Sequence, residues 1–141
     1  MISVTLLAAL AGCGTSPGGA PGPTPGSGGM GRPQPRPAVT LTLADGGRTV
    51  RLRVGQAVRV RLAAGGWGRW RQPVNSGPAL HRTYAAGGYP GSQPAVAVFR
   101  AVRPGRATVH SVTDFACLHA HPRCMVAQRV WAVPVAVTGA P

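Results

Sequence analysis

Short runs in which apolar and polar residues alternate constrain the fold of this chain more than any other feature. They cover Val39–Leu43, Val50–Val54, Val58–Leu62 and Val133–Val137, with shorter ones at Val96–Phe99 and Val109–Val112. Successive side chains of a strand point to opposite faces, so such runs indicate strands with one buried face. No stretch carries the apolar stripe of an amphipathic helix. We therefore predict an all-β domain in which antiparallel strands pack as a sandwich.

The predicted domain spans residues 38–141, which is enough chain for one two-layer core. Glycine and proline separate the alternating runs. Asp45-Gly46-Gly47 predicts a hairpin turn, and Gly55 and Pro104-Gly105 predict further breaks.

Residues 13–37 have a different composition, dominated by glycine, proline, serine and threonine after the cysteine. Such a segment buries too little apolar surface to offset the entropy of ordering it. We predict a disordered linker that holds the domain roughly 25–30 Å from residue 13.

Leu10-Ala11-Gly12-Cys13 follows a short apolar stretch and resembles the lipobox of bacterial lipoproteins. The resemblance implies that residues 1–12 are a signal peptide. Cys13 would then carry palmitate and anchor the protein to the extracytoplasmic face of the cell membrane. A charged n-region is absent from residues 1–4. The alternatives are a buried strand with a chance cysteine, or a start codon placed too far downstream. A transmembrane helix is excluded because it needs about 20 apolar residues.

One segment resembles a sequence motif that joins two late strands in bacterial immunoglobulin-like domains. It reads Phe99-Arg100-Ala101-Val102-Arg103-Pro104-Gly105-Arg106-Ala107-Thr108-Val109. The order of elements is similar to the chagasin family of cysteine-protease inhibitors, which are immunoglobulin-like β-sandwiches. That family presents three loops to a papain-like cleft. By order, residues 66–70 stand where the family has Asn-Pro-Thr-Thr-Gly, Gly87-Gly88 matches its glycine-rich middle loop, and the segment after Phe115 matches its Arg-Pro-aromatic loop.

Candidate binding residues gather in these three segments. Tryptophan and arginine are the residues most enriched at binding hot spots, and glycine lets a loop turn sharply. The candidates are Trp67, Arg69, Arg71, Gly87, Gly88, Tyr89, His119 and His121. Trp70 and Trp131 are assigned to the core, because sandwiches of this kind bury a tryptophan on the third strand and Trp131 alternates with Val133.

Cys117 and Cys124 are the cysteines that remain if Cys13 is lipidated, and in an oxidising compartment they predict a disulfide. The alternative is a metal site, because Cys117, His119, His121 and Cys124 are all ligand types. The thiols would have to stay reduced for that site, and we assign no metal or other cofactor. With the disulfide, the two histidines become exposed tips of the loop.

The chain carries fifteen arginines, no lysine and only two carboxylates, Asp45 and Asp114, which gives a net charge of +13. Arg51, Arg53, Arg59 and Arg61 are predicted on the outward face of two adjacent strands. Such a face suits anionic lipid headgroups or anionic envelope polymers. The alternative is a GC-rich coding bias together with protection against edge aggregation. We expect no specific nucleic-acid partner.

The sequence offers no catalytic set of residues. The nearest arrangement is a Ser-His-Asp relay within one strand, and neighbouring residues of a strand point to opposite faces. His110, Ser111 and Asp114 therefore cannot form a relay by themselves. The sequence predicts a monomeric, non-enzymatic, membrane-anchored module that binds a protein or envelope component through loops at one end of the sandwich. The alternatives are a chagasin-like inhibitor of papain-family proteases and a metal-holding envelope protein.

Overall fold

The computed structural model describes residues 37, 39–65 and 68–139. The chain divides into two compact units, Met1–Gly31 and Arg32–Pro141, and every described residue belongs to the second unit. The predicted signal peptide, Cys13 and nearly all of the predicted linker lie outside the described residues. In the part of the chain that is described, no helix has the length and apolar character needed to cross a membrane.

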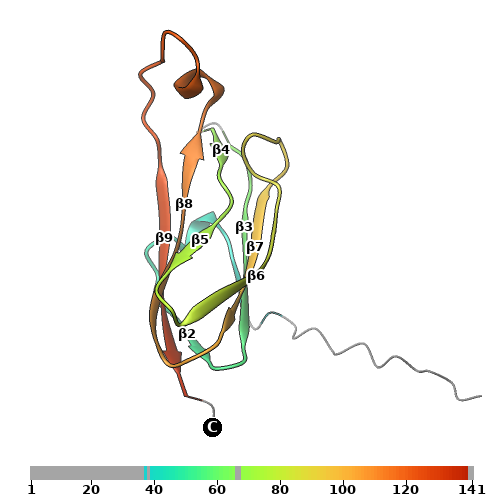
Figure 1. Ribbon diagram of the computed structural model, residues 1–141, viewed down its shortest axis with the longest axis vertical. Coiled ribbons are helices and arrows are strands. Elements are labelled where there is room, and N and C mark those ends of the chain that lie inside the picture. Colours follow the sequence, from blue (N-terminus) through green and yellow to red (C-terminus); the bar gives the residue numbers. More distant parts are fainter. Residues whose placement is uncertain (1–36, 38, 66–67, 140–141) are drawn as a thin grey trace, which may run out of the picture. The chain divides into compact units, whose positions relative to one another are not determined.

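The described residues form two β-sheets, as the alternation predicted (Figure 1). The four-stranded sheet has the order β1 (Val39–Leu41), β3 (Ala57–Leu62), β7 (Ala95–Ala101) and β6 (Leu80–Ala86). The five-stranded sheet contains β2 (Val50–Arg53), β9 (Val130–Thr138), β8 (Gly105–Asp114) and β4 (Arg69–Trp70), with β5 (Val74–Ser76) also paired to β8. Two short 3-10 turns, η1 (Leu43–Asp45) and η2 (Ala116–His119), complete the set. The all-β prediction is confirmed.

The pairing within each sheet is mixed. The central pairs β3–β7, β6–β7 and β8–β9 are antiparallel, as predicted. The strands β1 and β2 instead run parallel to β3 and β9. These two strands come early in the chain and join partners that are not connected to them by hairpins, so alternation alone could not give their direction.

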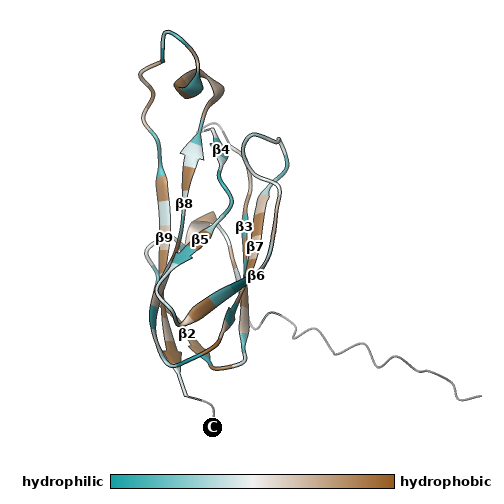
Figure 2. Ribbon diagram, viewed as in Figure 1, coloured by the Kyte–Doolittle hydropathy of each residue, from teal (hydrophilic) through white to brown (hydrophobic). Residues whose placement is uncertain are grey.

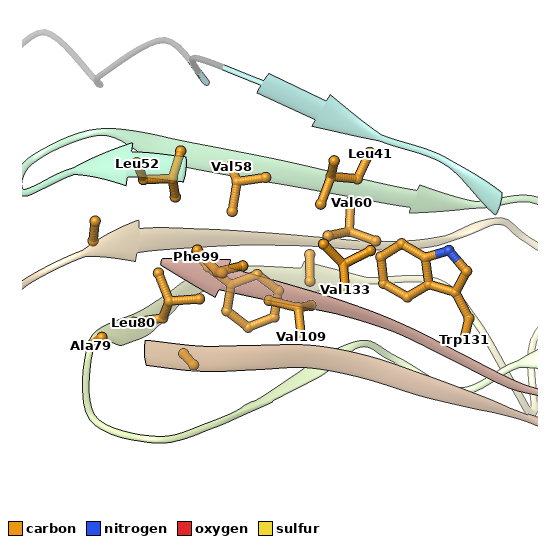
Figure 3. Close-up of a cluster of buried hydrophobic side chains, with 14 of the residues drawn as sticks. Leu41, Leu52, Val58, Val60, Ala79, Leu80, Phe99, Val109, Trp131 and Val133 are labelled. Atoms are coloured by element: carbon orange, nitrogen blue, oxygen red, sulfur yellow. The ribbon is translucent and has the colours of Figure 1, made fainter. Parts of the chain in front are cut away.

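Apolar side chains from both sheets meet between the layers (Figure 3). Phe99 lies in the middle of the core and is fully buried, and Trp131 is 4% exposed at one end of the cluster. Trp70 is 7% exposed, so both tryptophans assigned to the core are confirmed there. Figure 2 shows the apolar and polar alternation along β8 and β9. Val96 and Val98 lie on the outer side of β7, because Phe99 occupies the inner side and neighbouring positions must alternate.

The prediction that the arginine pairs lie on adjacent strands is wrong. Arg51 and Arg53 are on β2 in the five-stranded sheet, whereas Arg59 and Arg61 are on β3 in the four-stranded sheet. The turn at Gly55 connects the two sheets, and the Gly55 amide donates to the carbonyl oxygen of Ala101 at 2.8 Å. An alternating pattern fixes which face of a strand is buried but not which strands are neighbours.

The predicted hairpin at Asp45 is also wrong, because β1 and β2 belong to different sheets. Asp45 instead ends η1, where its carboxylate accepts a hydrogen bond from the Thr42 amide at 2.8 Å and pairs with Arg48 at 2.9 Å. The backbone hydrogen bond from Thr42 lowers the pKa of Asp45 below its ordinary value. Leu43, expected to continue the alternation, is 43% exposed because the strand has already ended.

Candidate functional site

Three loops meet at one end of the sandwich, and we call them the loop cluster: residues 68–71, 87–94 and 115–124 (Figure 1). Direct contacts join each loop to another. Arg69 donates to the carbonyl oxygen of Pro90 at 2.8 Å, and the Tyr89 amide donates to the carbonyl oxygen of Trp70 at 2.8 Å. The rings of Tyr89 and His119 stack with their centres 5.6 Å apart. The described residues of the three segments predicted from the sequence therefore form one surface.

The carboxylate of Asp114 lies beneath this surface at the end of β8, and the residue is 2% exposed. Its Oδ2 accepts from Nε of Arg71 at 2.8 Å. Its Oδ1 lies 2.8 Å from Nε2 of His119 and also accepts from the Phe115 amide at 2.8 Å. Arg71 directly follows β4 in the first loop, whereas Phe115 and His119 both lie in the third loop, residues 115–124. One buried carboxylate therefore fixes two of the three loops relative to each other.

The electrostatics of Asp114 reflect two opposing effects. Burial alone raises the pKa of a carboxyl group, because it penalises the charged form. The hydrogen bonds from His119, the Phe115 amide and Arg71 outweigh that burial and hold the pKa of Asp114 below its ordinary value. The carboxylate is thus ionised at neutral pH.

Glycines allow the loops to approach one another closely. Gly68 has a φ of +94°, and a Cβ atom there would lie 2.5 Å from Cζ of Phe115. Gly88 has a φ of +78°, and a Cβ atom there would lie 2.7 Å from the carbonyl oxygen of Trp70. A larger residue would push the first loop away from the third, or the second away from the first. The predicted middle loop at Gly87-Gly88 therefore has a structural role in the cluster.

A disulfide joins Cys117 and Cys124 with an S–S distance of 2.05 Å, as predicted. The Cys124 amide also donates to the carbonyl oxygen of Cys117 at 3.2 Å. Both sulfur atoms are occupied, so the metal alternative loses two of its four ligands. Among the residues described, no group of three or more His, Cys, Asp or Glu side chains is placed to hold a metal ion.

The structure changes the interpretation of several candidates. His119, predicted as an exposed tip, has a half-exposed side chain that contacts both Asp114 and Tyr89. The Arg71 side chain is also half-exposed and is bound to Asp114. His121 is exposed as predicted. Trp67 lies outside the described residues, although Gly65 and Gly68, on either side of residues 66 and 67, pair with each other.

Two residues of the site, Asp114 and Phe115, are not among the candidates that the sequence predicts. The sequence presents Asp114 as a carboxylate near His110 and Ser111, with which it cannot form a catalytic relay. A usable signal existed, since a carboxylate is rare among so many arginines and stands next to the cysteine loop. Phe115 gave no signal beyond its position as a boundary of the third loop.

Together, the two sheets form an immunoglobulin-like β-sandwich. The structure is similar to the crystal structure of the cysteine protease inhibitor EhICP2 from Entamoeba histolytica, with a TM-score of 0.52 and 11% identity, covering 74% of this chain and 100% of that one. The solution structure of amebosin has a TM-score of 0.44 and 15% identity, covering 72% of this chain and 99% of that one. No protein-family model and no curated protein matches the sequence. The likeness concerns the fold.

Replacing Asp114 by Asn tests the buried carboxylate. Because the pKa of Asp114 is lowered in the folded protein, its stabilisation is complete above the unfolded-state pKa and is lost as pH falls through the folded value. We expect Asp114→Asn to lower the free energy of unfolding by about 1.5–3 kcal/mol at pH 7, as for hydrogen bonds to charged groups. The difference from the wild type should begin to shrink below about pH 5 and should continue to shrink as the pH falls through the lowered folded-state pKa. Urea unfolding at several pH values measures both.

Asp45→Asn is the matched control, because the pKa of Asp45 is also lowered but this carboxylate lies outside the loop cluster. As the pH falls, the free energy of unfolding of this variant should still decrease by the part that protonation of Asp114 causes. A pH-independent difference between Asp114→Asn and the wild type would contradict the assignment.

The disulfide is tested by replacing Cys117 and Cys124 with serine in a chain that also carries Cys13→Ser. Closing the short ring is worth roughly 2.5 kcal/mol by the chain-entropy estimate, so the double variant should unfold at lower urea concentration than the Cys13→Ser parent. Mass spectrometry of the parent should show a deficit of about two hydrogens relative to the reduced chain. A parent that reacts with two equivalents of a thiol reagent without denaturant would contradict the bond.

Proposed function

We propose that this protein is a non-enzymatic inhibitor that binds a papain-like cysteine protease through the loop cluster. The observation that carries the proposal is the gathering of three loops at one end of a sandwich whose fold resembles a cysteine protease inhibitor. This is the alternative function given by the sequence, and it now replaces the general binding module as the leading hypothesis.

The contacts within the cluster favour such a role. Association is weakened when loops must be ordered on binding, so loops held in place beforehand bind more tightly. Asp114, the disulfide and the Tyr89–His119 stack supply that order before any partner arrives. Half-exposed side chains remain available above it, notably Arg71 and His119.

The target protease should differ from those recognised through the usual family motifs. The first loop reads Gly66-Trp67-Gly68-Arg69-Trp70 in place of Asn-Pro-Thr-Thr-Gly, and Ala116-Cys117-Leu118-His119 follows Phe115 where the family has Arg-Pro-aromatic. We infer that Trp67 is the principal anchor, because Trp70 is in the core and tryptophan dominates binding hot spots.

Titration of papain with the purified Cys13→Ser chain tests the proposal. We expect tight competitive inhibition that Trp67→Ala weakens by at least about 30-fold, the effect of losing a hot-spot residue. Val102→Ala is the matched control, because Val102 is 46% exposed at the opposite end, in the connection between β7 and β8, and its loss should leave inhibition unchanged.

Chymotrypsin serves as the second control and should not be inhibited. Absence of papain inhibition at micromolar concentration, with the chain folded by circular dichroism, would remove the inhibitor hypothesis. The remaining hypothesis would then be that the loop cluster binds another protein or an envelope component.

We also propose that Cys13 carries a lipid that holds the domain on the extracytoplasmic face of a bacterial membrane. The lipobox-like Leu10-Ala11-Gly12-Cys13 and the disulfide, a bond typical of oxidising compartments, both support this location.

Expression of the full chain in a bacterium fed a clickable palmitate analogue tests the anchor. The wild type should be labelled and should lose residues 1–12, whereas Cys13→Ser should be unlabelled. Cys117→Ser/Cys124→Ser is the matched control and should remain labelled. A wild-type protein found unlabelled in the soluble fraction with Met1 in place would refute the anchor.

A further inference from the structure

We propose that the outer side of the four-stranded sheet is a second binding surface, one that lies flat on an anionic lipid bilayer. We call it the basic face, and it carries the exposed side chains of Arg59 and Arg61 on β3, Arg100 on β7, and His81 and Tyr84 on β6. The proposal is independent of protease binding by the loop cluster.

Register places these side chains together. Arg59 pairs with Val98, which pairs with Tyr84 on the next strand, and Ala57 pairs with Arg100, which pairs with His81. Alternation puts all of them on the side away from the core, since Val58, Val60 and Phe99 occupy the inner side. The strands β3, β7 and β6 lie side by side in Figure 1.

No carboxylate neutralises the basic face. The chain has only two acidic side chains, and both are engaged elsewhere. Asp45 pairs with Arg48 beside η1, and Asp114 pairs with Arg71 and His119 at the end of the other sheet. Three arginines therefore present an uncompensated positive charge, which is complementary to anionic lipid headgroups.

An aromatic side chain lies within this charge. Tyr84 is 53% exposed and lines a groove of about 610 Å³ together with Arg59, Arg100 and Val98. Tyrosine is enriched at membrane–water interfaces, where its ring contacts the acyl boundary and its hydroxyl stays hydrated. Cations around an exposed tyrosine suit a planar lipid surface better than they suit a fully hydrated polymer.

The segment that follows Cys13 in the sequence ends next to the described domain. Pro37, the first residue that the structure describes, lines the same groove. That segment contains Arg32 and Arg36, and its own charge makes it an unsuitable occupant of a cationic groove. If Cys13 is anchored as proposed above, the same bilayer is within reach of the basic face.

The opposite sheet provides a matched control. Arg51 and Arg106 both pair with Ala136 and, with the nearby Arg53, form a cationic patch on the other outer face. The described residues of that patch include no exposed aromatic side chain. If net charge alone caused vesicle binding, removing the arginines of either patch would weaken binding equally. If the basic face is the binding surface, removing its arginines should weaken binding more.

Flotation of the unlipidated Cys13→Ser chain with phosphatidylglycerol vesicles tests the proposal. Each arginine near an anionic surface contributes about fivefold, so Arg59→Gln/Arg61→Gln/Arg100→Gln should weaken partitioning on the order of 100-fold. Arg51→Gln/Arg53→Gln/Arg106→Gln removes the same charge and should weaken it by less than about fivefold. Tyr84→Ala should weaken it severalfold.

Three results would overturn the assignment. The first is no binding of the Cys13→Ser chain to phosphatidylglycerol vesicles. The second is an equal loss in the two triple variants when both remain folded by circular dichroism. The third is binding of soluble polyphosphate as tight, per phosphate, as binding of the vesicles, which would identify a polyanion site instead. Because the papain assay reports on the loop cluster alone, failure of either proposal is distinguishable from failure of the other.

Discussion

The buried carboxylate of Asp114 is the interaction on which the candidate binding end depends. A charge removed from water is costly unless it is paired and hydrogen-bonded, and here the Arg71 guanidinium, the His119 ring and the Phe115 amide together satisfy it. The donors belong to two different loops, so the need to satisfy one carboxylate sets the distance between those loops. The middle loop then joins through the Tyr89 ring on His119 and the Tyr89 amide on Trp70.

In this arrangement, some residues of the loop cluster hold the loops in position, and others keep side-chain atoms available for a binding partner. Gly68, Gly88 and the disulfide fix close approaches that larger or unlinked residues would not permit. Arg69 and Arg71, chosen from the sequence as contact residues, spend part of their hydrogen-bonding capacity on Pro90 and Asp114. A guanidinium group has five N–H donors, so each arginine can hold a loop and still offer donors to a partner.

Much of the fold could be predicted from the sequence, because alternation reports directly on which side of a strand is buried. Val58, Val60 and Leu62 are fully buried while Arg59 and Arg61 between them are exposed, as the pattern requires. Strand neighbours could not be predicted, since pairing depends on where each connection leads. In the loop cluster, the disulfide followed from counting cysteines, but the role of Asp114 depends on contacts with Arg71, which is 43 residues away in the chain.

The crossing of the chain between sheets also resolves a problem of charge. If β2 and β3 had formed a hairpin, Arg51, Arg53, Arg59 and Arg61 would have stood side by side, and like charges on paired strands are destabilising. The connection at Gly55 instead places one arginine pair on each outer face. Packed sheets lie about 10 Å apart and outward side chains add to that separation, which exceeds the screening length of about 8 Å at physiological salt. The two arginine pairs therefore repel each other less than they would in a hairpin, and the exposed Arg59 and Arg61 can attract an anionic surface.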